Sequence, residues 1–473
     1  MNGKQAQGPE RFRIERPDLI PTARYHDPAF MQLEEERFWS RVWQMACRLE
    51  EIPEPDDFVE YRILSRSVVL IRQKDGAVKA FENACRHRGL KLCEDRGTAR
   101  GGISCPFHAW HYNTDGTCRA VFQPALFDPA VLRKEDIDLV PVRVETWGGC
   151  AFITFDDHAP PLRECLGPFA PMEEMRQVED LKVALWIAIR LPANWKMAAE
   201  AFMESYHVLR SHPQLVSMFG LTIEGFNEAA ARGITSSSGM RNSADYAGGG
   251  QLIEKQLTYY RNLSEGMAGM ISPREIAVAE RLRGEVVLPD DPAEAMTAWR
   301  LALNKAIHTD AVASGLPIFP IHEQPLPTLT PVHFAFPNFF ILPPFTAASS
   351  YRIRPLGPEE CLFDIWSLDR FPEGQERPRL TTPVPMAHDD PAVPPVPTQD
   401  FANLPRQQQG IHAPSLTHLR LAEKQEGLIS NFERLIDGFI YGWSEAEIRD
   451  GYGKASGAID QPIAPMGAVS EPA

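Results

Sequence analysis

Two short segments of the sequence each combine one cysteine with one histidine, and they limit the possible folds more than any other feature. The first reads Ala84-Cys85-Arg86-His87-Arg88-Gly89, and the second reads Ser104-Cys105-Pro106-Phe107-His108-Ala109-Trp110. A single residue separates Cys85 from His87, so both side chains must leave the same tight loop. The two segments together therefore predict two loops that offer four ligands to one metal centre.

Two thiolates with two imidazoles are the ligand set of a Rieske [2Fe–2S] cluster, in which the cysteines bind one iron and the histidines bind the other. In a structural zinc site, two to four residues normally separate the first two ligands, whereas a single residue separates Cys85 from His87. We therefore expect a one-electron carrier here. A zinc knuckle and a chance arrangement of cysteines are the weaker alternatives.

A second motif contains Glu204, His207 and His212, followed by Pro213. Histidines five residues apart point about 140° apart on an ideal helix, so they can bind one metal only if the helix ends between them. Pro213 disfavours helical backbone at His212 and supplies that break. Two imidazoles and a distant carboxylate form the facial triad of non-haem Fe(II) oxygenases. Such a pair alone is more often a surface feature, but the upstream electron carrier favours the iron site.

The composition excludes several other classes of protein. The 473 residues include 63 Asp and Glu against 48 Lys and Arg, and the net charge of -15 disfavours a nucleic-acid binder. No apolar run approaches the ~20 residues that a bilayer span needs, and the first residues have no apolar signal core. We expect a cytoplasmic protein without a membrane partner. Its 8 cysteines are too few for a disulfide scaffold.

The predicted secondary structure changes along the chain. Residues 1–42 are predicted to form a helical segment that packs with the catalytic domain. Short β-prone runs separated by turn residues predict a small antiparallel β domain over 43–157. Helices and strands of a larger domain follow over 158–473. Within it, residues 378–398 are rich in proline and are predicted to form an irregular connecting loop.

These motifs resemble those of the large (α) subunit of Rieske non-haem iron aromatic-ring-hydroxylating oxygenases. The similarity runs from Tyr25-His26-Asp27-Pro28 to the last helix. Its most specific parts are Cys-x-His-Arg-Gly, Cys-Pro-Phe-His-x-Trp, Asn-Trp-Lys and Glu-x-x-x-Glu-Ser-Tyr-His-x-x-x-x-His. The resemblance implies an α+β fold, with a small antiparallel-β Rieske domain inserted into a larger α+β catalytic domain whose antiparallel sheet is flanked by helices.

The resemblance also assigns ligands. It implies that the [2Fe–2S] cluster is bound by Cys85, His87, Cys105 and His108, and that the mononuclear Fe(II) is bound by His207 and His212. The third iron ligand of the family is a carboxylate far downstream, followed closely by Asn and Gln. Asp400, followed by Asn403 and Gln407, fits that pattern. Asp389 and Asp390 compete with it but lie inside the proline-rich segment.

Three departures from the family pattern matter. Ala109 replaces a usual glycine. Glu204 replaces a usual aspartate, which in the family carries electrons between a cluster histidine of one subunit and an iron histidine of its neighbour in a trimer. Some relatives that act on non-aromatic substrates also have glutamate there. Residues 215–325 match no family motif, and we expect them to cover the substrate channel.

The resemblance implies a terminal oxygenase with electrons supplied from NADH by a reductase, a ferredoxin or both. The sequence contains no Gly-x-Gly-x-x-Gly fingerprint, so we do not expect the chain itself to bind a nicotinamide or flavin. We expect a homotrimer, with or without a small β subunit. Two other classes are possible. A pure electron-transfer Rieske protein leaves the second motif without a role, and a zinc-stabilised binding module is disfavoured by the Cys-x-His spacing.

The substrate is predicted to be an apolar, aromatic or polycyclic compound that is mono- or dihydroxylated with O₂ at the mononuclear Fe(II), as in aromatic hydrocarbon catabolism. The alternative is a Rieske monooxygenase that performs oxidative N- or O-demethylation or C–N cleavage on a non-aromatic substrate. Four apolar side chains are predicted to line the substrate pocket: Phe202, Met203, Phe336 and Phe340. Phe336 and Phe340 belong to an aromatic segment, 333–342, that is predicted to be a strand, and such a strand is more often part of the hydrophobic core.

Overall fold

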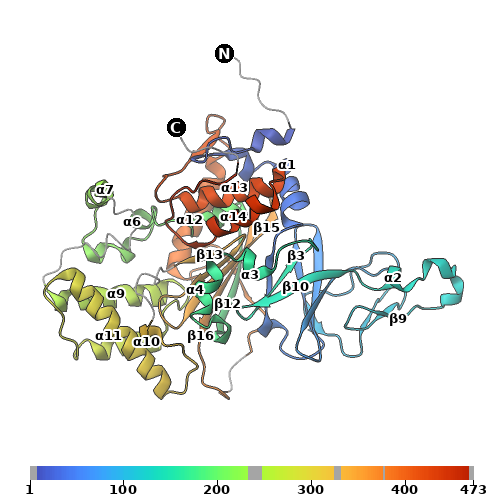
Figure 1. The fold of residues 1–473 in the computed structure, drawn as a ribbon, viewed down its shortest axis with the longest axis horizontal. Helices are drawn as coiled ribbons and strands as arrows, with labels where there is room; N and C mark the ends of the chain where they lie inside the picture. Colours follow the sequence, from blue (N-terminus) through green and yellow to red (C-terminus); the bar gives the residue numbers. More distant parts are fainter. Residues whose placement is uncertain (1–7, 233–247, 324–331, 376–378, 468–473) are drawn as a thin grey trace, which may run out of the picture. The chain divides into compact units, whose positions relative to one another are not determined.

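The computed structural model describes residues 8–232, 248–323, 332–375 and 379–467, and the chain divides into two compact units (Figure 1). Unit 1 is discontinuous along the chain, and unit 2 is inserted into it. Unit 1 comprises Met1–Glu34, Arg163–Pro378 and Pro383–Ala473, and unit 2 comprises Glu35–Leu162 and Arg379–Thr382.

Unit 2 is built on a seven-stranded antiparallel sheet. The order of its strands is β2-β11-β10-β5-β4-β3-β6. The interior strand β4 buries the apolar run Val68–Ile71, which is what a strand covered on both faces requires. The bounds are β2 Gln44–Arg48, β3 Asp57–Ile63, β4 Arg66–Arg72, β5 Val78–Glu82, β6 Arg96–Thr98, β10 Pro141–Trp147 and β11 Cys150–Thr154.

A second, three-stranded sheet of unit 2 follows the first Cys-His segment. It has the order β7-β8-β9, with β7 Ile103–Ser104, β8 His111–Tyr112 and β9 Cys118–Ala120. The second Cys-His segment connects β7 to β8, so it forms the tip of a hairpin. Short helices follow at η5 Pro124–Leu126, η6 Pro129–Val131 and α2 Lys134–Ile137.

Unit 1 also contains a seven-stranded sheet, ordered β17-β12-β16-β15-β14-β13-β19. All neighbours are antiparallel except β17, which pairs in parallel with β12. The bounds are β12 Lys182–Leu191, β13 His333–Ala335, β14 Phe339–Leu342, β15 Ala348–Gly357, β16 Glu360–Asp369, β17 Val384–Ala387 and β19 Gly457–Ala458. A small two-stranded sheet pairs β1 Leu19–Pro21 with β18 His418–Arg420.

The helices of unit 1 form two contacting groups. α9, α10 and α11 contact one another, and α13 contacts α14 (Figure 1). α13 is buried along most of its length and ends at Gly442, whose φ of 74° is the left-handed conformation that glycine favours. The bounds are α1 Pro28–Leu33, α3 Leu162–Cys165, α4 Phe169–Glu174, α5 Trp195–Glu200, α6 Val208–Ser211, α7 Ile223–Ala231, α9 Gly249–Gly266, α10 Pro273–Leu282, α11 Pro292–Ala313, α12 Pro395–Gly410, α13 Gly427–Tyr441 and α14 Glu445–Lys454.

Buried ion pairs connect the start of the chain to α5 and α13. Arg24 donates to Glu433 at 2.8 Å and also pairs with Asp437. Lys196, from the Asn-Trp-Lys motif, donates 2.9 Å bonds to Glu34 and to the carbonyl of Arg24. A buried charge is tolerated only when it is paired in this way. The N-terminal segment is therefore part of the core of unit 1.

The predicted fold class is confirmed, because a mostly antiparallel β domain is inserted into a larger unit with an antiparallel sheet and many helices. The unit boundaries differ from the predicted segments of 1–42, 43–157 and 158–473, since they fall after Glu34 and after Leu162. Among the helices in the described ranges, none has the length and apolar character that crossing a bilayer requires.

The proline-rich segment 378–398 is more regular than the sequence predicts. Residue 378 lies outside the described residues, but β17 forms at Val384–Ala387 and α12 begins at Pro395. β17 is an edge strand, where proline is tolerated because no ladder hydrogen bond is lost on the open side. Proline also suits the first turn of α12, whose N–H groups have no partner within the helix.

Candidate active site and metal centres

The two Cys-His segments fold into loops of the same backbone pattern. In the first, Cys85 N–H donates to the Leu90 carbonyl at 2.8 Å, and Gly89 N–H donates to the Cys85 carbonyl at 2.8 Å. In the second, Cys105 N–H donates to the Trp110 carbonyl at 2.8 Å, and Ala109 N–H donates to the Cys105 carbonyl at 2.9 Å. The two loops are therefore matched, with Gly89 and Ala109 in equivalent positions.

Ala109 has a φ of 55°, in the left-handed region, and Gly89 has a φ of 74°. A side chain in that region costs about 1–2 kcal/mol relative to ordinary backbone. This explains why glycine is usual at the position of Ala109, and the small methyl group is the least demanding replacement.

The four predicted cluster ligands come together as a thiol pair and an imidazole pair. Burial raises the pKa of the Cys85 thiol, and the neighbouring Cys105 thiol raises it further. The rings of His87 and His108 lie 4.5 Å apart between centroids. Nδ1 of His87 is buried without a hydrogen-bond partner, as a metal ligand would be. Burial also lowers the pKa of His87, which favours the neutral, metal-binding form.

Tyr112, on β8, contacts this group. Its hydroxyl lies 3.3 Å from Sγ of Cys85 and accepts a 3.0 Å hydrogen bond from the backbone N–H of Arg86. Since that N–H can only donate, the Tyr112 proton is available to Cys85. Tyr112 is fully buried, so no water competes for the bond.

The second motif lies at the end of α5. The side chain of Asn194 accepts the N–H of Lys196 at 2.9 Å and starts that helix. The chain leaves helical structure after Glu200 and forms only one further turn, α6. His207 precedes α6 and His212 follows it. The predicted break before Pro213 is present, and it places the two histidines at opposite ends of a single turn.

His207, His212 and Asp400 form a compact set of three metal-ligand side chains. Nε2 of His212 lies 3.1 Å from Nε2 of His207 and 3.1 Å from Oδ1 of Asp400. Nε2 of His207 lies 3.7 Å from the same oxygen. Ligands about 2.1 Å from a metal and at right angles to each other are about 3.0 Å apart, so these atoms suit one face of an octahedron.

Oδ2 of Asp400 is also buried without a hydrogen-bond partner. The side chains of Asp400 and His212 are 4% and 3% exposed, so an unpaired carboxylate here needs a cation. His207 is 24% exposed and forms the more open side of the set. The donor atoms present therefore fit a mononuclear iron.

Hydrogen bonds fix the tautomers of both histidines. Nδ1 of His207 donates to Oε1 of Glu204 at 2.5 Å, and Nδ1 of His212 donates to Oε1 of Gln399 at 2.7 Å. In its neutral, metal-binding form each histidine therefore carries its proton on Nδ1 and directs Nε2 to the metal position. Gln399 is itself oriented by Gln214, which donates to the same Oε1 at 2.8 Å.

Charge around His207 is negative. Burial lowers its pKa, but the hydrogen bond that His207 donates to Glu204 and the charges of Glu204, Asp400 and Asp460 outweigh burial and raise the pKa to about 9. Asp460 is held nearby because it accepts hydrogen bonds from the N–H and hydroxyl of Ser205, at 2.9 and 2.7 Å. These carboxylates make the site attractive to a cation.

Two cavities flank this cluster, and Glu204, His207 and Asp400 line both. The first, of about 80 Å³, is mainly apolar and includes Phe202. The second, of about 360 Å³, is more polar and includes Glu200 and Glu426. Helix α9 and the turn after it contribute to the apolar cavity, so part of the segment 215–325 borders the predicted substrate channel.

The predicted pocket residues are only partly at this cavity. Phe202 lines it, whereas Met203, Phe336 and Phe340 are not among the residues that line it. Phe336 packs against Phe432 at a ring distance of 5.8 Å, inside the core. The buried aromatic strand is thus mostly core, the more common role for such a strand.

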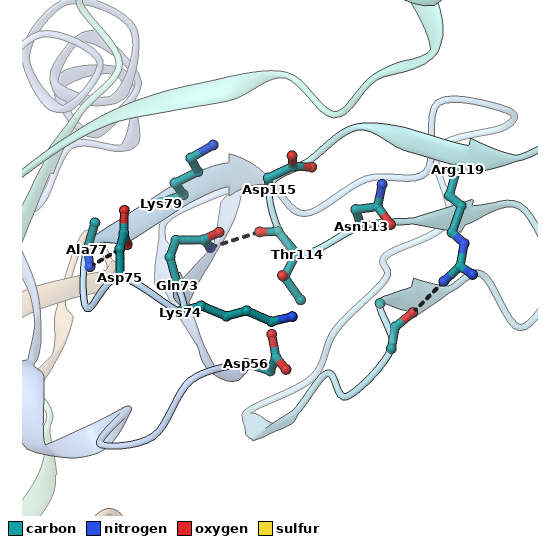
Figure 2. A pocket seen from close by; sticks show the side chains of 12 residues that line it. Asp56, Gln73, Lys74, Asp75, Ala77, Lys79, Asn113, Thr114, Asp115 and Arg119 are labelled. Carbon is teal, nitrogen blue, oxygen red and sulfur yellow. Dashed lines mark hydrogen bonds between the residues drawn. The ribbon is translucent and has the colours of Figure 1, made fainter.

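A separate hollow of about 540 Å³ lies in unit 2 (Figure 2). Its charged residues balance, with Lys74, Lys79 and Arg119 against Asp56, Asp75 and Asp115. Asp75 and Asp115 accept backbone N–H groups of their own turns, from Ala77 and Thr117, both at 3.0 Å. The polar groups therefore serve the turns, and the hollow has no surplus charge for an ionic ligand.

Several residues of the site were not predicted. Gln214 and Asp460 orient the metal-ligand segment but belong to no motif, and Ser205 lies inside the Glu-Ser-Tyr-His motif without a predicted role. Gln399 directly precedes Asp400 in the sequence, and no role was predicted for it. The position of Gln214, directly after His212-Pro213, is the one local signal that could have pointed to it.

Comparison with known families agrees with this geometry. Residues 178–441, more than half of the chain, match the family described as "Ring hydroxylating alpha subunit (catalytic domain)", and residues 42–129 match the Rieske [2Fe-2S] domain. The chain belongs to the ring-hydroxylating α-subunit family of Rieske non-haem iron oxygenases. It therefore has a Rieske [2Fe–2S] domain and a catalytic domain of the kind that binds mononuclear iron.

Two curated relatives are similar over part of the chain. The carnitine monooxygenase oxygenase subunit of Acinetobacter baumannii is 33% identical over 215 residues, 43% of this chain and 56% of the relative. The glycine betaine monooxygenase oxygenase subunit of Pseudomonas aeruginosa is 33% identical over 197 residues, 42% of this chain and 45% of the relative. The chain thus spans about half the length of the curated relatives it matches.

The fold is shared more widely. A solved structure of naphthalene 1,2-dioxygenase bound to phenanthrene has a TM-score of 0.60 and 20% identity, covering 94% of this chain and 98% of the other. At that identity the likeness shows the fold alone.

The predicted class of enzyme is confirmed, but the predicted substrate is wrong. The relatives are named for carnitine and glycine betaine, which are trimethylammonium compounds and not aromatic hydrocarbons. The comparison contradicts hydroxylation of an aromatic or polycyclic substrate and agrees better with the alternative, oxidative demethylation or C–N cleavage. The glutamate at position 204 had already weakened the aromatic interpretation.

Replacing Tyr112 by Phe should lower the reduction potential of the cluster by tens of millivolts and leave its visible spectrum recognisable. A hydrogen bond to a cluster sulfur stabilises the reduced form, and Tyr112 is placed to donate one to Cys85. The measurement is a spectroscopic redox titration. Tyr61→Phe, in the same unit but bonded to Gln44 at 3.2 Å, is the control and should leave the potential unchanged. An unchanged potential in Tyr112→Phe would contradict the assignment of this bond.

Replacing Asp400 by Ala should reduce the iron content from about three to about two per chain while the cluster absorption remains, because the two metal sites use separate segments. Metal analysis and visible spectroscopy measure both. Asp390→Ala is the matched control, since Asp390 instead accepts the N–H of Ala392 at 2.8 Å. If Asp390→Ala or Asp389→Ala loses the third iron and Asp400→Ala keeps it, the carboxylate ligand lies in the proline-rich segment.

Proposed function

We propose that this protein is the oxygenase component of a Rieske monooxygenase that oxidises an N-methyl carbon of an ammonium substrate and so cleaves a C–N bond. The supporting observation is the position of His207, His212 and Asp400, which present three ligand atoms beside an apolar cavity. The trimethylammonium compounds in the names of the two relatives support the choice of substrate.

The metal ligands follow from the loops and the three-residue set. Cys85 and Cys105 would bind one iron of the cluster, and His87 and His108 the other. His207, His212 and Asp400 would hold the mononuclear iron, which supplies the activation of O₂. The protein's own contribution is to orient both rings through Glu204 and Gln399 so that each Nε2 faces the iron position, and to exclude water with apolar cavity walls.

The overall reaction balances with two electrons and two protons. A trimethylammonium group, O₂, two electrons and two protons give an N-hydroxymethyl group and water. The hydroxymethyl compound then breaks its C–N bond to release formaldehyde, a proton and the dimethylamine. The electrons come from outside this chain, so we propose a ferredoxin, an NADH-dependent reductase or both as partners.

Glu204 is proposed to carry electrons between subunits of a homotrimer. Both oxygens of its carboxylate already contact His207, with Oε1 accepting from Nδ1 at 2.5 Å and Oε2 accepting from the backbone N–H at 3.1 Å. Each oxygen has a further lone pair, so the same carboxylate can accept a hydrogen bond from a cluster histidine of the neighbouring subunit. A small β subunit is not required by this arrangement.

The test of the function is a formaldehyde assay. The purified oxygenase, with a reductase that reduces its cluster, is incubated with O₂ and with N-methylated ammonium compounds or aromatic hydrocarbons. We expect one formaldehyde per O₂ consumed with an N-methylated compound and no diol from the hydrocarbons. A diol from an aromatic hydrocarbon, without formaldehyde from any amine, would overturn the proposal.

Replacing Glu204 by Gln should slow turnover about 10- to 100-fold, the usual cost of losing a partner of a metal-ligating histidine. The amide can still accept the Nδ1–H of His207, so the iron content and cluster spectrum should be retained. Stopped-flow reoxidation of the reduced cluster by O₂, with substrate present, measures the step directly. Glu426→Gln is the control, because Glu426 borders the same second cavity but bonds to the N–H of Ala422 at 2.6 Å. Equal reoxidation rates in wild type and Glu204→Gln would show another electron route.

A further inference from the structure

The apolar cavity beside the metal ligands has side chains suited to an ammonium group. Phe202 and Tyr259 supply aromatic rings, and Met267 and Met270 supply polarisable thioethers. Aromatic faces attract methylated ammonium ions through the negative charge of their π-systems. The other walls are mostly aliphatic.

The ring of Phe202 is held in a fixed position. It packs against Tyr351 at 5.0 Å and Phe363 at 5.5 Å between centroids, at 66° and 59°. Tyr259 comes from α9 and contacts Phe219 at 5.9 Å. These two rings belong to different elements, so a methylammonium head can contact aromatic carbon from two directions.

The charged groups of the cavity are acidic. Glu204 and Asp400 line it, and neither Lys nor Arg does so among the residues that the structure describes. A bound Fe(II) would offset these two carboxylates, and Asp460, which bonds to Ser205, adds further negative charge close by. A substrate carboxylate placed in this cavity would lose its water and find no cationic side chain.

Inside this cavity a substrate carboxylate would also compete with O₂ for the metal, because Arg420 lines the second cavity and not this one. The carboxylates of carnitine and glycine betaine would both meet this difficulty here. A cation with apolar substituents meets no such cost, because Asp460 and the aromatic rings attract its charge and the apolar walls accept its carbon atoms.

We propose that the substrate of this protein is an N-methylated amine cation whose remaining substituents are apolar and carry no carboxylate. This inference rests on the proposed function and narrows its substrate class. It separates this chain from the zwitterionic compounds in the names of its relatives.

The experiment measures binding without turnover. Calorimetry on the iron-loaded oxygenase under argon compares butyltrimethylammonium with 4-(trimethylammonio)butanoate, which differ only in a terminal methyl or carboxylate. We expect the first to bind at least about tenfold more tightly. Choline is compared with its uncharged isostere 3,3-dimethylbutan-1-ol, and we expect choline to bind at least about fivefold more tightly.

Variants of Tyr259 connect the preference to the cavity. Tyr259→Leu should weaken choline binding at least about threefold and leave 3,3-dimethylbutan-1-ol unchanged, whereas Tyr259→Phe should retain the wild-type preference. Tyr259→Lys should reverse the order of butyltrimethylammonium and 4-(trimethylammonio)butanoate. Met270→Leu, in the same cavity, is the matched control and should preserve the order.

Equal or tighter binding of 4-(trimethylammonio)butanoate by the wild type would overturn the inference, and so would failure of both trimethylammonium compounds to bind. The proposed function fails separately, if no N-methylated compound yields formaldehyde in the turnover assay. Binding order and formaldehyde release are independent readouts, so the two failures can be told apart.

Discussion

The buried ion pairs of Arg24 and Lys196 hold together the part of the protein on which the iron site depends. Burial lowers the pKa of Arg24, but the charges of Asp437 and Glu433 outweigh it and keep the guanidinium ionised. Lys196 joins this group through the Arg24 carbonyl and Glu34. Removing one partner of such a pair typically costs about 3–5 kcal/mol, because a charge is left buried and unpaired. Since Lys196 lies in the first turn of α5, these pairs fix the helix that leads to the metal ligands.

The parts of the site that the sequence predicts are those whose chemistry is local. Each Cys-His loop closes on itself through bonds between residues four or five apart, so its motif contains most of the information needed to build it. The break between His207 and His212 also follows from a local cause, Pro213. Asp400 could be predicted only through the family pattern, because it is brought to His212 by the packing of α12 and not by its neighbours in sequence.

The parts that the sequence does not predict depend on packing between distant segments. Gln214 and Gln399 are 185 residues apart, and neither has a motif. Phe336 and Phe340 were predicted at the pocket because the segment 333–342 is aromatic. Phe336 lies in the turn between β13 and β14 and Phe340 lies on β14, and both are buried, so composition alone does not tell which side chains meet a cavity. The prolines of 378–398 predicted an irregular loop, but part of this segment forms an edge strand and the first turn of a helix. Both of these positions tolerate proline, whereas the interior of a sheet or helix does not.

The carboxylate of Glu204 bonds to two groups of His207, three residues further along the chain, namely the ring Nδ1–H and the backbone N–H. The same carboxylate borders both cavities. Glu204 therefore places negative charge in the apolar cavity proposed for the substrate, and also in the second cavity, on the side of the proposed electron route. One side chain can thus orient an iron ligand, accept a bond from a neighbouring subunit and favour a cationic substrate.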